Sequence, residues 1–117
     1  MNQTERQVIE WSMSRGIYDH SNAQAQTLKA VSEMGELADA IIKDDQDAVK
    51  DAIGDVMVCL VNVAYLRGLT LGECFSSAYD AIKDRKGRMV AGGAFVKEAD
   101  SLSETGRGDG GFGSTGR

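Results

Sequence analysis

Residues 51–66 read DAIGDVMVCLVNVAYL, and this stretch decides whether the centre of the protein is a helix or a strand. Its β-branched residues would suit a buried strand. However, some twenty residues from 46 to 67 run without a turn signal, whereas a strand typically has about 4–8 residues. Ala48, Ala52 and Ala64 also favour a helix. We therefore predict a helix that is apolar on nearly all sides. Such a helix must be surrounded by its own bundle or by a second subunit, so we expect a homo-oligomer.

Capping signals place three more helices around this one. At Thr4, Ser21 and Thr70, a hydroxyl residue is followed three residues later by Glu or Gln, which is the capping-box pattern of a helix start. Asp44 and Asp45 can cap the remaining helix. The predicted helices cover residues 4–15, 22–43, 46–67 and 70–86. The expected fold class is all-α, with a four-helix bundle-like core.

Two features follow the last predicted helix. Short apolar pieces on either side of Gly92-Gly93 predict a short C-terminal β-hairpin. The last twelve residues contain six glycines, and almost nothing from residue 98 onward can be buried. We therefore expect one domain over residues 1–97 and a flexible Gly-rich tail over residues 98–117.

Composition restricts the partners and the location. The 117 residues are 42% hydrophobic and 26% charged, as in one soluble globular domain. A formal net charge of -5 argues against nucleic acid as a partner. The longest apolar stretch, residues 56–66, is far shorter than the ~20 residues of a membrane span, and the N-terminus lacks a secretory signal. We expect no membrane association and a cytoplasmic location, with Cys59 and Cys74 as free thiols in the core.

Four acidic residues form the most informative pattern, Glu33-x-x-Glu36 and Asp51-x-x-x-Asp55. Consecutive helices joined by a tight turn run antiparallel, so residues equidistant from the turn lie side by side. Glu33 and Asp55 are each eleven residues from Asp44, while Glu36 and Asp51 are eight and seven away. The four carboxylates therefore fall at one level, where a cation would relieve their repulsion. Oxygen ligands favour Mg²⁺ or Mn²⁺, and Mg²⁺ shares its shell with phosphates, so the pattern points to phosphoryl chemistry.

Solvated helix faces are the alternative interpretation of these acids. The apolar side of the second helix centres on Met34 and Ile41, which leaves Glu36 close to the opposite side. The third helix favours a site instead, because Asp55 and Asn62 lie in an otherwise apolar helix and need partners there. Both interpretations stay open on the pattern alone.

Three runs carry a resemblance to a known family: QTLKAVSEMGELADAI (26–41), DAIGDVMVCLVNVA (51–64) and SSAYDAIKDRKGRMV (76–90). Over residues 24–97 the chain resembles the MazG-like nucleotide pyrophosphohydrolases, in a short form common in phage and bacteria. The resemblance implies a four-helix core, usually dimeric or tetrameric. It also implies hydrolysis of nucleoside triphosphates to the monophosphate and pyrophosphate.

The resemblance also assigns roles to the acids. Glu33, Glu36 and Asp55 match the family's acidic positions, which implies that they hold Mg²⁺ or Mn²⁺. The family usually has a further glutamate where this chain has Ala52, and Asp51, one residue earlier, is the candidate replacement. One carboxylate that is not fully engaged by metal would act as the general base.

Substrate contacts and competing functions complete the predictions. Three basic residues are candidates for the phosphate chain, although a solvated helix end explains them equally well: Lys83, Arg85 and Lys86. Trp11 either packs in the core or stacks on a base, with core packing favoured, and Lys29 is expected to pair with Glu33. A dUTPase-like or deoxynucleotide-selective hydrolase and a non-catalytic helical interaction module are the alternatives. A ferritin-like di-iron bundle is excluded, because it needs Glu-x-x-His pairs and His20 is the only histidine.

Overall fold

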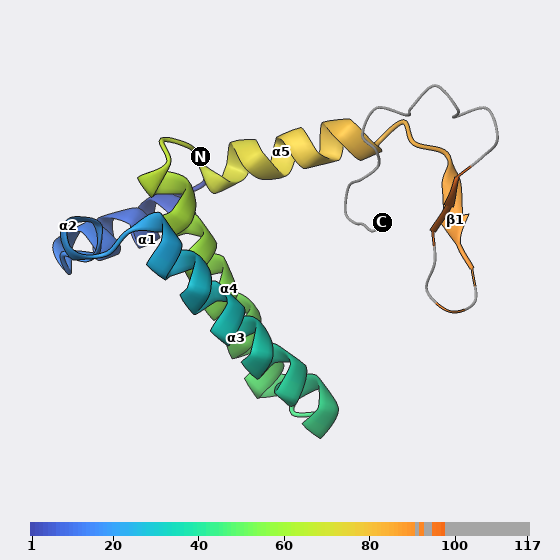
Figure 1. Ribbon diagram of the computed structural model, residues 1–117, viewed down its shortest axis with the longest axis horizontal. Coiled ribbons are helices and arrows are strands. Elements are labelled where there is room, and N and C mark those ends of the chain that lie inside the picture. Colours follow the sequence, from blue (N-terminus) through green and yellow to red (C-terminus); the bar gives the residue numbers. More distant parts are fainter. Residues whose placement is uncertain (91, 93–94, 98–117) are drawn as a thin grey trace. The chain divides into compact units, whose positions relative to one another are not determined.

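Two long antiparallel helices, α3 and α4, lie side by side (Figure 1). The computed structural model describes residues 1–90, 92 and 95–97. Helix α3 (Ala23–Lys43) is joined to α4 (Gln46–Leu66) by a two-residue turn, in which Asp44 has a positive φ of 56°. The Asp45 side chain caps α4 by accepting a hydrogen bond of 3.1 Å from the Ala48 amide. The helix predicted over residues 46–67 is confirmed.

Shorter helices precede and follow this hairpin. α1 (Gln3–Ser14) and α2 (Ile17–His20) lie at the end of the hairpin away from its turn, where α1 contacts α4 (Figure 1). Gly16, with a φ of 76°, makes the turn between them, and α2 was not predicted. α5 (Leu71–Ile82) buries none of its residues. It ends at Ile82 rather than at residue 86, because residues 83–84 form a turn and β1 begins at Gly87. The all-α class is confirmed.

Small side chains form the contact between α3 and α4. Ala30 and Ala40 of α3 are buried, as are Ala52 and Cys59 of α4. Small residues let two helix backbones approach closely, so larger side chains must lie at the sides of the contact. The predicted apolar face of α3 is accordingly exposed, with 50% of Met34 and 59% of Ile41 accessible. Within one chain, the contact with α4 is therefore made by a different face of α3.

The helices begin with polar capping residues, as predicted, but two of the caps come from residues other than the predicted ones. The capping box of Thr70 is confirmed, since its hydroxyl accepts a hydrogen bond of 3.0 Å from the Glu73 amide. Asn2 and Asn22 cap α1 and α3 in place of Thr4 and Ser21. α5 receives a second cap from α1, because the buried Glu5 carboxylate accepts from the amides of residues 71 and 72. A buried carboxylate at this place satisfies backbone donors that would otherwise lack partners.

The chain divides into two units, Met1–Ser77 and Ala78–Arg117. In the second unit, β1 (Gly87–Met89) pairs antiparallel with β2 (Phe95–Lys97), which confirms the predicted hairpin. Gly92 has a φ of 91°, a conformation suited to glycine in a tight turn. Residues 91 and 93–94 and the predicted tail over residues 98–117 lie outside the described part of the chain.

No single helix of the described residues is both long and apolar enough to cross a membrane. Taken together, α4 and α5 have the length and the apolar composition of a membrane span, but a sharp bend separates the two helices. Of the two cysteines, Cys59 is buried as predicted, whereas Cys74 is exposed on α5 and does not belong to the core.

Enlarging a residue in the α3–α4 contact tests the importance of close approach. Ala30→Leu is expected to lower the free energy of unfolding by about 1–3 kcal/mol, because the added side chain must push the helices apart. Ala25→Leu, on the exposed side of the same helix, is the control and should change it by no more than ~0.5 kcal/mol. Urea denaturation followed by circular dichroism measures both values. Equal stability of the two variants would contradict the close contact.

Candidate active site

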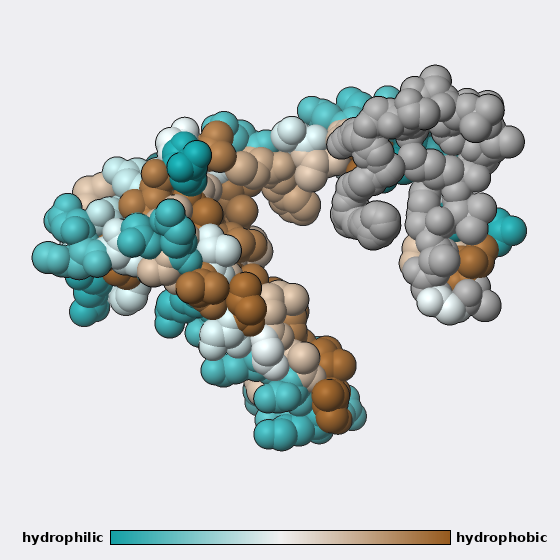
Figure 2. Space-filling model, in the orientation of Figure 1, coloured by the Kyte–Doolittle hydropathy of each residue, from teal (hydrophilic) through white to brown (hydrophobic). Residues whose placement is uncertain are grey.

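The α3–α4 hairpin has two chemically different sides. Helical spacing of 100° per residue puts the three acids Glu36, Asp51 and Asp55 on one side of the contact stripe, which we call the acidic flank. It puts large apolar side chains on the other side, which we call the apolar flank: Val31, Met34, Ile41, Ile53, Met57 and Leu60. Toward the turn, Figure 2 shows brown along one side of the hairpin and teal along the other. The acidic flank is therefore the candidate site.

Glu33 lies at the edge of the helix contact, next to the acidic flank. Its side chain is only 16% exposed, and one of its carboxylate oxygens is 3.7 Å from the Lys29 ammonium. The two residues are four apart, so they occupy neighbouring turns of one helix face. The predicted ion pair between Lys29 and Glu33 is confirmed.

Charged side chains of both helices influence the buried thiol of Cys59. Burial raises the pKa of the Cys59 thiol, and the negative charges of Glu33 and Asp55 raise it further, while the positive charge of Lys29 lowers it. Glu33 belongs to α3 and Asp55 to α4, so both carboxylates lie within electrostatic reach of the same thiol. This is the arrangement that their equal distance from the turn predicts.

Three of the four acids, Glu36, Asp51 and Asp55, are exposed, and only Glu33 is partly buried. Ala52 is buried. Across residues 1–90, 92 and 95–97, no group of three Asp, Glu, His or Cys side chains is placed to hold a metal ion. Mg²⁺, however, commonly takes only one or two carboxylates and completes its shell with water and substrate phosphates. The all-oxygen donors of the acidic flank suit an ion of this kind.

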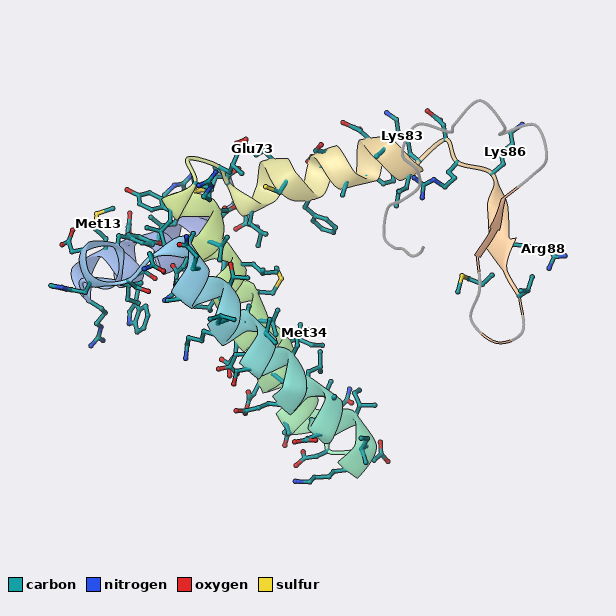
Figure 3. All side chains as sticks on the ribbon, viewed as in Figure 1. Met13, Met34, Glu73, Lys83, Lys86 and Arg88 are labelled. Atoms are coloured by element: carbon teal, nitrogen blue, oxygen red, sulfur yellow. The ribbon has the colours of Figure 1, made fainter. Side chains whose placement is uncertain are left out.

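The predicted phosphate-binding residues belong to the second unit. The Lys83 ammonium lies 3.4 Å from the Asp80 carboxylate. Arg85 and Lys86 follow in the segment between α5 and β1, where Figure 3 labels Lys83 and Lys86, and it labels Arg88 beside β1. Contact of these residues with a phosphate chain stays a prediction.

Trp11 does not pack in the core, so that expectation was wrong. It is 48% exposed, and the Arg15 guanidinium lies 5.1 Å from the centre of its ring. Glu5, Ile9 and Ser12 are the buried residues of α1 instead. Stacking of Trp11 on a nucleotide base stays a prediction.

A buried polar network connects the helices beside the acidic flank. Asn62 is 2% exposed and accepts a hydrogen bond of 2.7 Å from the Tyr18 hydroxyl. Its own amide nitrogen donates to the Gln26 side chain at 3.4 Å, and Gln26 donates to Ser21 at 3.1 Å. The sequence signalled only Asn62, as a polar residue in an apolar helix that needs partners. Nothing in the pattern marked Tyr18 or Gln26, because the chain segments meet only in the folded protein.

Tyr18 is fixed in this network by its ring as well as by its hydroxyl. The ring stacks on Tyr65 with 4.2 Å between centroids. Burial raises the pKa of the Tyr18 phenol, more strongly than the nearby Ser12 hydroxyl lowers it. Ser12 itself is fully buried, and its hydroxyl meets the geometric criteria for a hydrogen bond with none of the described residues. The network therefore holds α2 against α3 and α4.

Comparisons with known proteins agree with this arrangement. A family model described as the MazG nucleotide pyrophosphohydrolase domain matches residues 22–90, more than half of the chain. An uncharacterized 18.2 kDa protein from the rep-hol intergenic region of Haemophilus phage HP1 is 33% identical over 64 residues. That match covers 55% of this chain and 39% of the phage protein, so the chain spans well under half the length of this relative. No solved structure matches the chain.

Thiol alkylation tests the environment of Cys59. With iodoacetamide at pH 8, Cys74 is expected to react at least about tenfold faster than Cys59, which is buried and has a raised pKa and therefore less thiolate. Mass spectrometry of the two cysteine peptides over time measures both rates. In urea the rates should become similar, and similar rates in the folded protein would contradict the site geometry.

Proposed function

The chain belongs to the MazG nucleotide pyrophosphohydrolase domain family, and on that basis we propose that it hydrolyses nucleoside triphosphates to the monophosphate and pyrophosphate. Enzymes of this family generally depend on a divalent metal ion. The observation that supports the proposal is the position of Glu36, Asp51 and Asp55 on one side of the α3–α4 hairpin, with the Glu33 carboxylate at its edge. Carboxylates that lie close together repel one another, and a bound cation relieves this repulsion.

The positions of the acids on this flank suggest a catalytic role for each of them. Glu33 and Asp55 would hold the metal, for which we propose Mg²⁺, with Mn²⁺ as a substitute. The bound ion would neutralise charge on the triphosphate and on the departing pyrophosphate. Glu36 and Asp51 are exposed on the same flank, so either carboxylate can orient the attacking water and accept its proton. Lys29 keeps the Glu33 side chain at the edge of the flank.

We also propose that the apolar flank is the contact between two copies of this chain. Six large apolar side chains lie exposed on one side of the hairpin, and apolar patches of this extent mark interaction sites. Two hairpins related by a two-fold axis would pair these flanks and form a four-helix bundle. The acidic flanks would then remain open to nucleotide on the outside. A tetramer would need a further contact.

Pyrophosphate release tests the activity. With Mg²⁺ and a panel of canonical and modified nucleoside triphosphates that includes dUTP, we expect release that EDTA abolishes. Asp55→Asn should lower the rate by about 100-fold or more, the scale for losing one electrostatic group in an active site. Asp39→Asn makes the same chemical change on an exposed part of α3 outside the acidic flank and should keep the activity.

The same panel of nucleotides also distinguishes the proposed activity from the alternative functions. Turnover of dUTP or of deoxynucleotides alone would identify a selective hydrolase. If no nucleotide is hydrolysed while the protein is folded, the acids are a solvated face and the hairpin is an interaction module.

Light scattering coupled to size-exclusion chromatography tests the oligomer. The unmodified protein is expected to elute as a dimer or tetramer. Met34→Lys, on the apolar flank, should give monomers, because a charge cannot be buried in the contact without a partner. Leu28→Lys, on the outer side of the same helix, is the matched control and should leave the mass unchanged. A monomeric unmodified protein would rule out the proposed contact.

A further inference from the structure

We propose that the buried, hydrogen-bonded pair of Gln26 and Asn62 selects the face of α3 that meets α4, and thereby positions Glu33 at the edge of the acidic flank. The two amides are positioning residues, because they act through the packing of the helices and do not touch the reacting atoms. Their importance for catalysis rests on the proposed function, whereas the choice of face is a property of the fold.

Two faces of α3 compete for the contact with α4. One carries the large apolar side chains of Met34 and Ile41, and the other carries Ala30 and Ala40. Burial of apolar area favours the first face, whereas close approach of the backbones favours the second. Both alanines are buried, while Met34 and Ile41 are 50% and 59% exposed. The alanine face is thus the one in contact, and a feature of that face is expected to exclude the other.

Gln26 lies at the centre of the alanine face. At 100° per residue, it is about 40° from Ala30 on one side and about 40° from Ala40 on the other. It is about 80° from Met34 by the same measure. Gln26 is 9% exposed and Asn62 is 2% exposed, so both amides are buried where the helices meet. A rotation of α3 that turned Met34 toward α4 would carry Gln26 away from Asn62.

Hydrogen bonds hold both amides in this orientation. The Asn62 amide nitrogen donates to the Gln26 side-chain oxygen at 3.4 Å, and the Gln26 nitrogen donates to the Ser21 hydroxyl at 3.1 Å. The Asn62 oxygen accepts from the Tyr18 hydroxyl at 2.7 Å. A buried amide that loses its partner costs free energy, so rotation of α3 away from this arrangement is unfavourable. A polar pair inside a helix contact can in this way specify one arrangement.

The same pair relates the two helices at the level of the acids. Gln26 and Asn62 are each 18 residues from Asp44, and their hydrogen bond shows that residues equally far from the turn face each other. Glu33 and Asp55 lie seven residues nearer the turn on each helix, which is about two helical turns and places them within about 20° of the amides. The turn therefore fixes the hairpin on one side of the acids, and the amide pair fixes it on the other.

NMR spectroscopy of a variant without the polar set tests the choice of face. Tyr18→Phe, Gln26→Leu and Asn62→Leu together remove the hydroxyl and both amides and leave apolar groups of similar size, so the variant is expected to fold. In the unmodified protein we expect methyl NOEs from Ala30 and Ala40 to α4, and we expect the triple variant to lose them. Retained NOEs would overturn the inference. A triple variant that does not melt cooperatively would overturn it as well, because the pair would then supply stability rather than choose a face.

Exchange of the two amides provides the rescue. Gln26→Asn combined with Asn62→Gln keeps one amide on each helix and the same total number of atoms, so the alanine NOEs should return. Gln24→Leu, at an exposed position of the same helix, is the matched control for Gln26→Leu and should also keep them. Loss of the alanine NOEs in either of these proteins would overturn the inference.

Pyrophosphate release with Mg²⁺ connects the choice of face with the site. We expect kcat of the folded triple variant to be at least about tenfold lower, because a small displacement of a catalytic group is costly, and we expect the exchanged variant to recover to within about threefold. Unchanged kcat in the triple variant would overturn the positioning role. If the unmodified protein hydrolyses no nucleotide, the proposed function fails, and the NOEs alone then decide the choice of face.

Discussion

The close contact between α3 and α4 is the constraint on which the rest of the structure depends. Alanines and a cysteine make up much of it, and the buried pair of Gln26 and Asn62 bridges the two helices at the end away from the turn. Because the helices approach so closely, Glu33 and Asp55 act on the same thiol although 22 residues separate them in the chain. The same closeness excludes the large apolar side chains from the contact and leaves them on one flank.

This arrangement gives the α3–α4 hairpin two surfaces of different chemical character, one acidic and one apolar. The acidic flank gathers negative charge, and the Lys29 ammonium lies 3.7 Å from Glu33 at its edge. The apolar flank needs to be covered, and a second copy offers a surface of the same kind. Ala52, at the level of the acids, is buried and contributes to the packing between the two helices.

Predictions from sequence succeeded where one segment carries its own signal. Asp45 and Thr70 cap the helices that they were expected to cap, and the predicted helical hairpin turns at Asp44. The predictions failed where the surroundings of a side chain are formed by segments that are distant in the sequence. Trp11 and Cys74 have apolar neighbours in sequence, yet both are exposed, since local composition does not say which face another helix covers. Tyr18 and Gln26 gave no signal, because their partner Asn62 is distant in sequence.

By itself, the sequence determined that the chain is helical, where its hairpin turns and which acids share a level, because caps, periodicity and spacing are properties of consecutive residues. Only the tertiary structure decided which face of α3 meets α4. Met34 and Ile41 are more hydrophobic than Ala30 and Ala40, so hydrophobicity alone favours the wrong face. The small residues prevail because two helix backbones can approach closely only where side chains are short. That choice, made between elements rather than within one, puts the acids and the exposed apolar residues on opposite flanks.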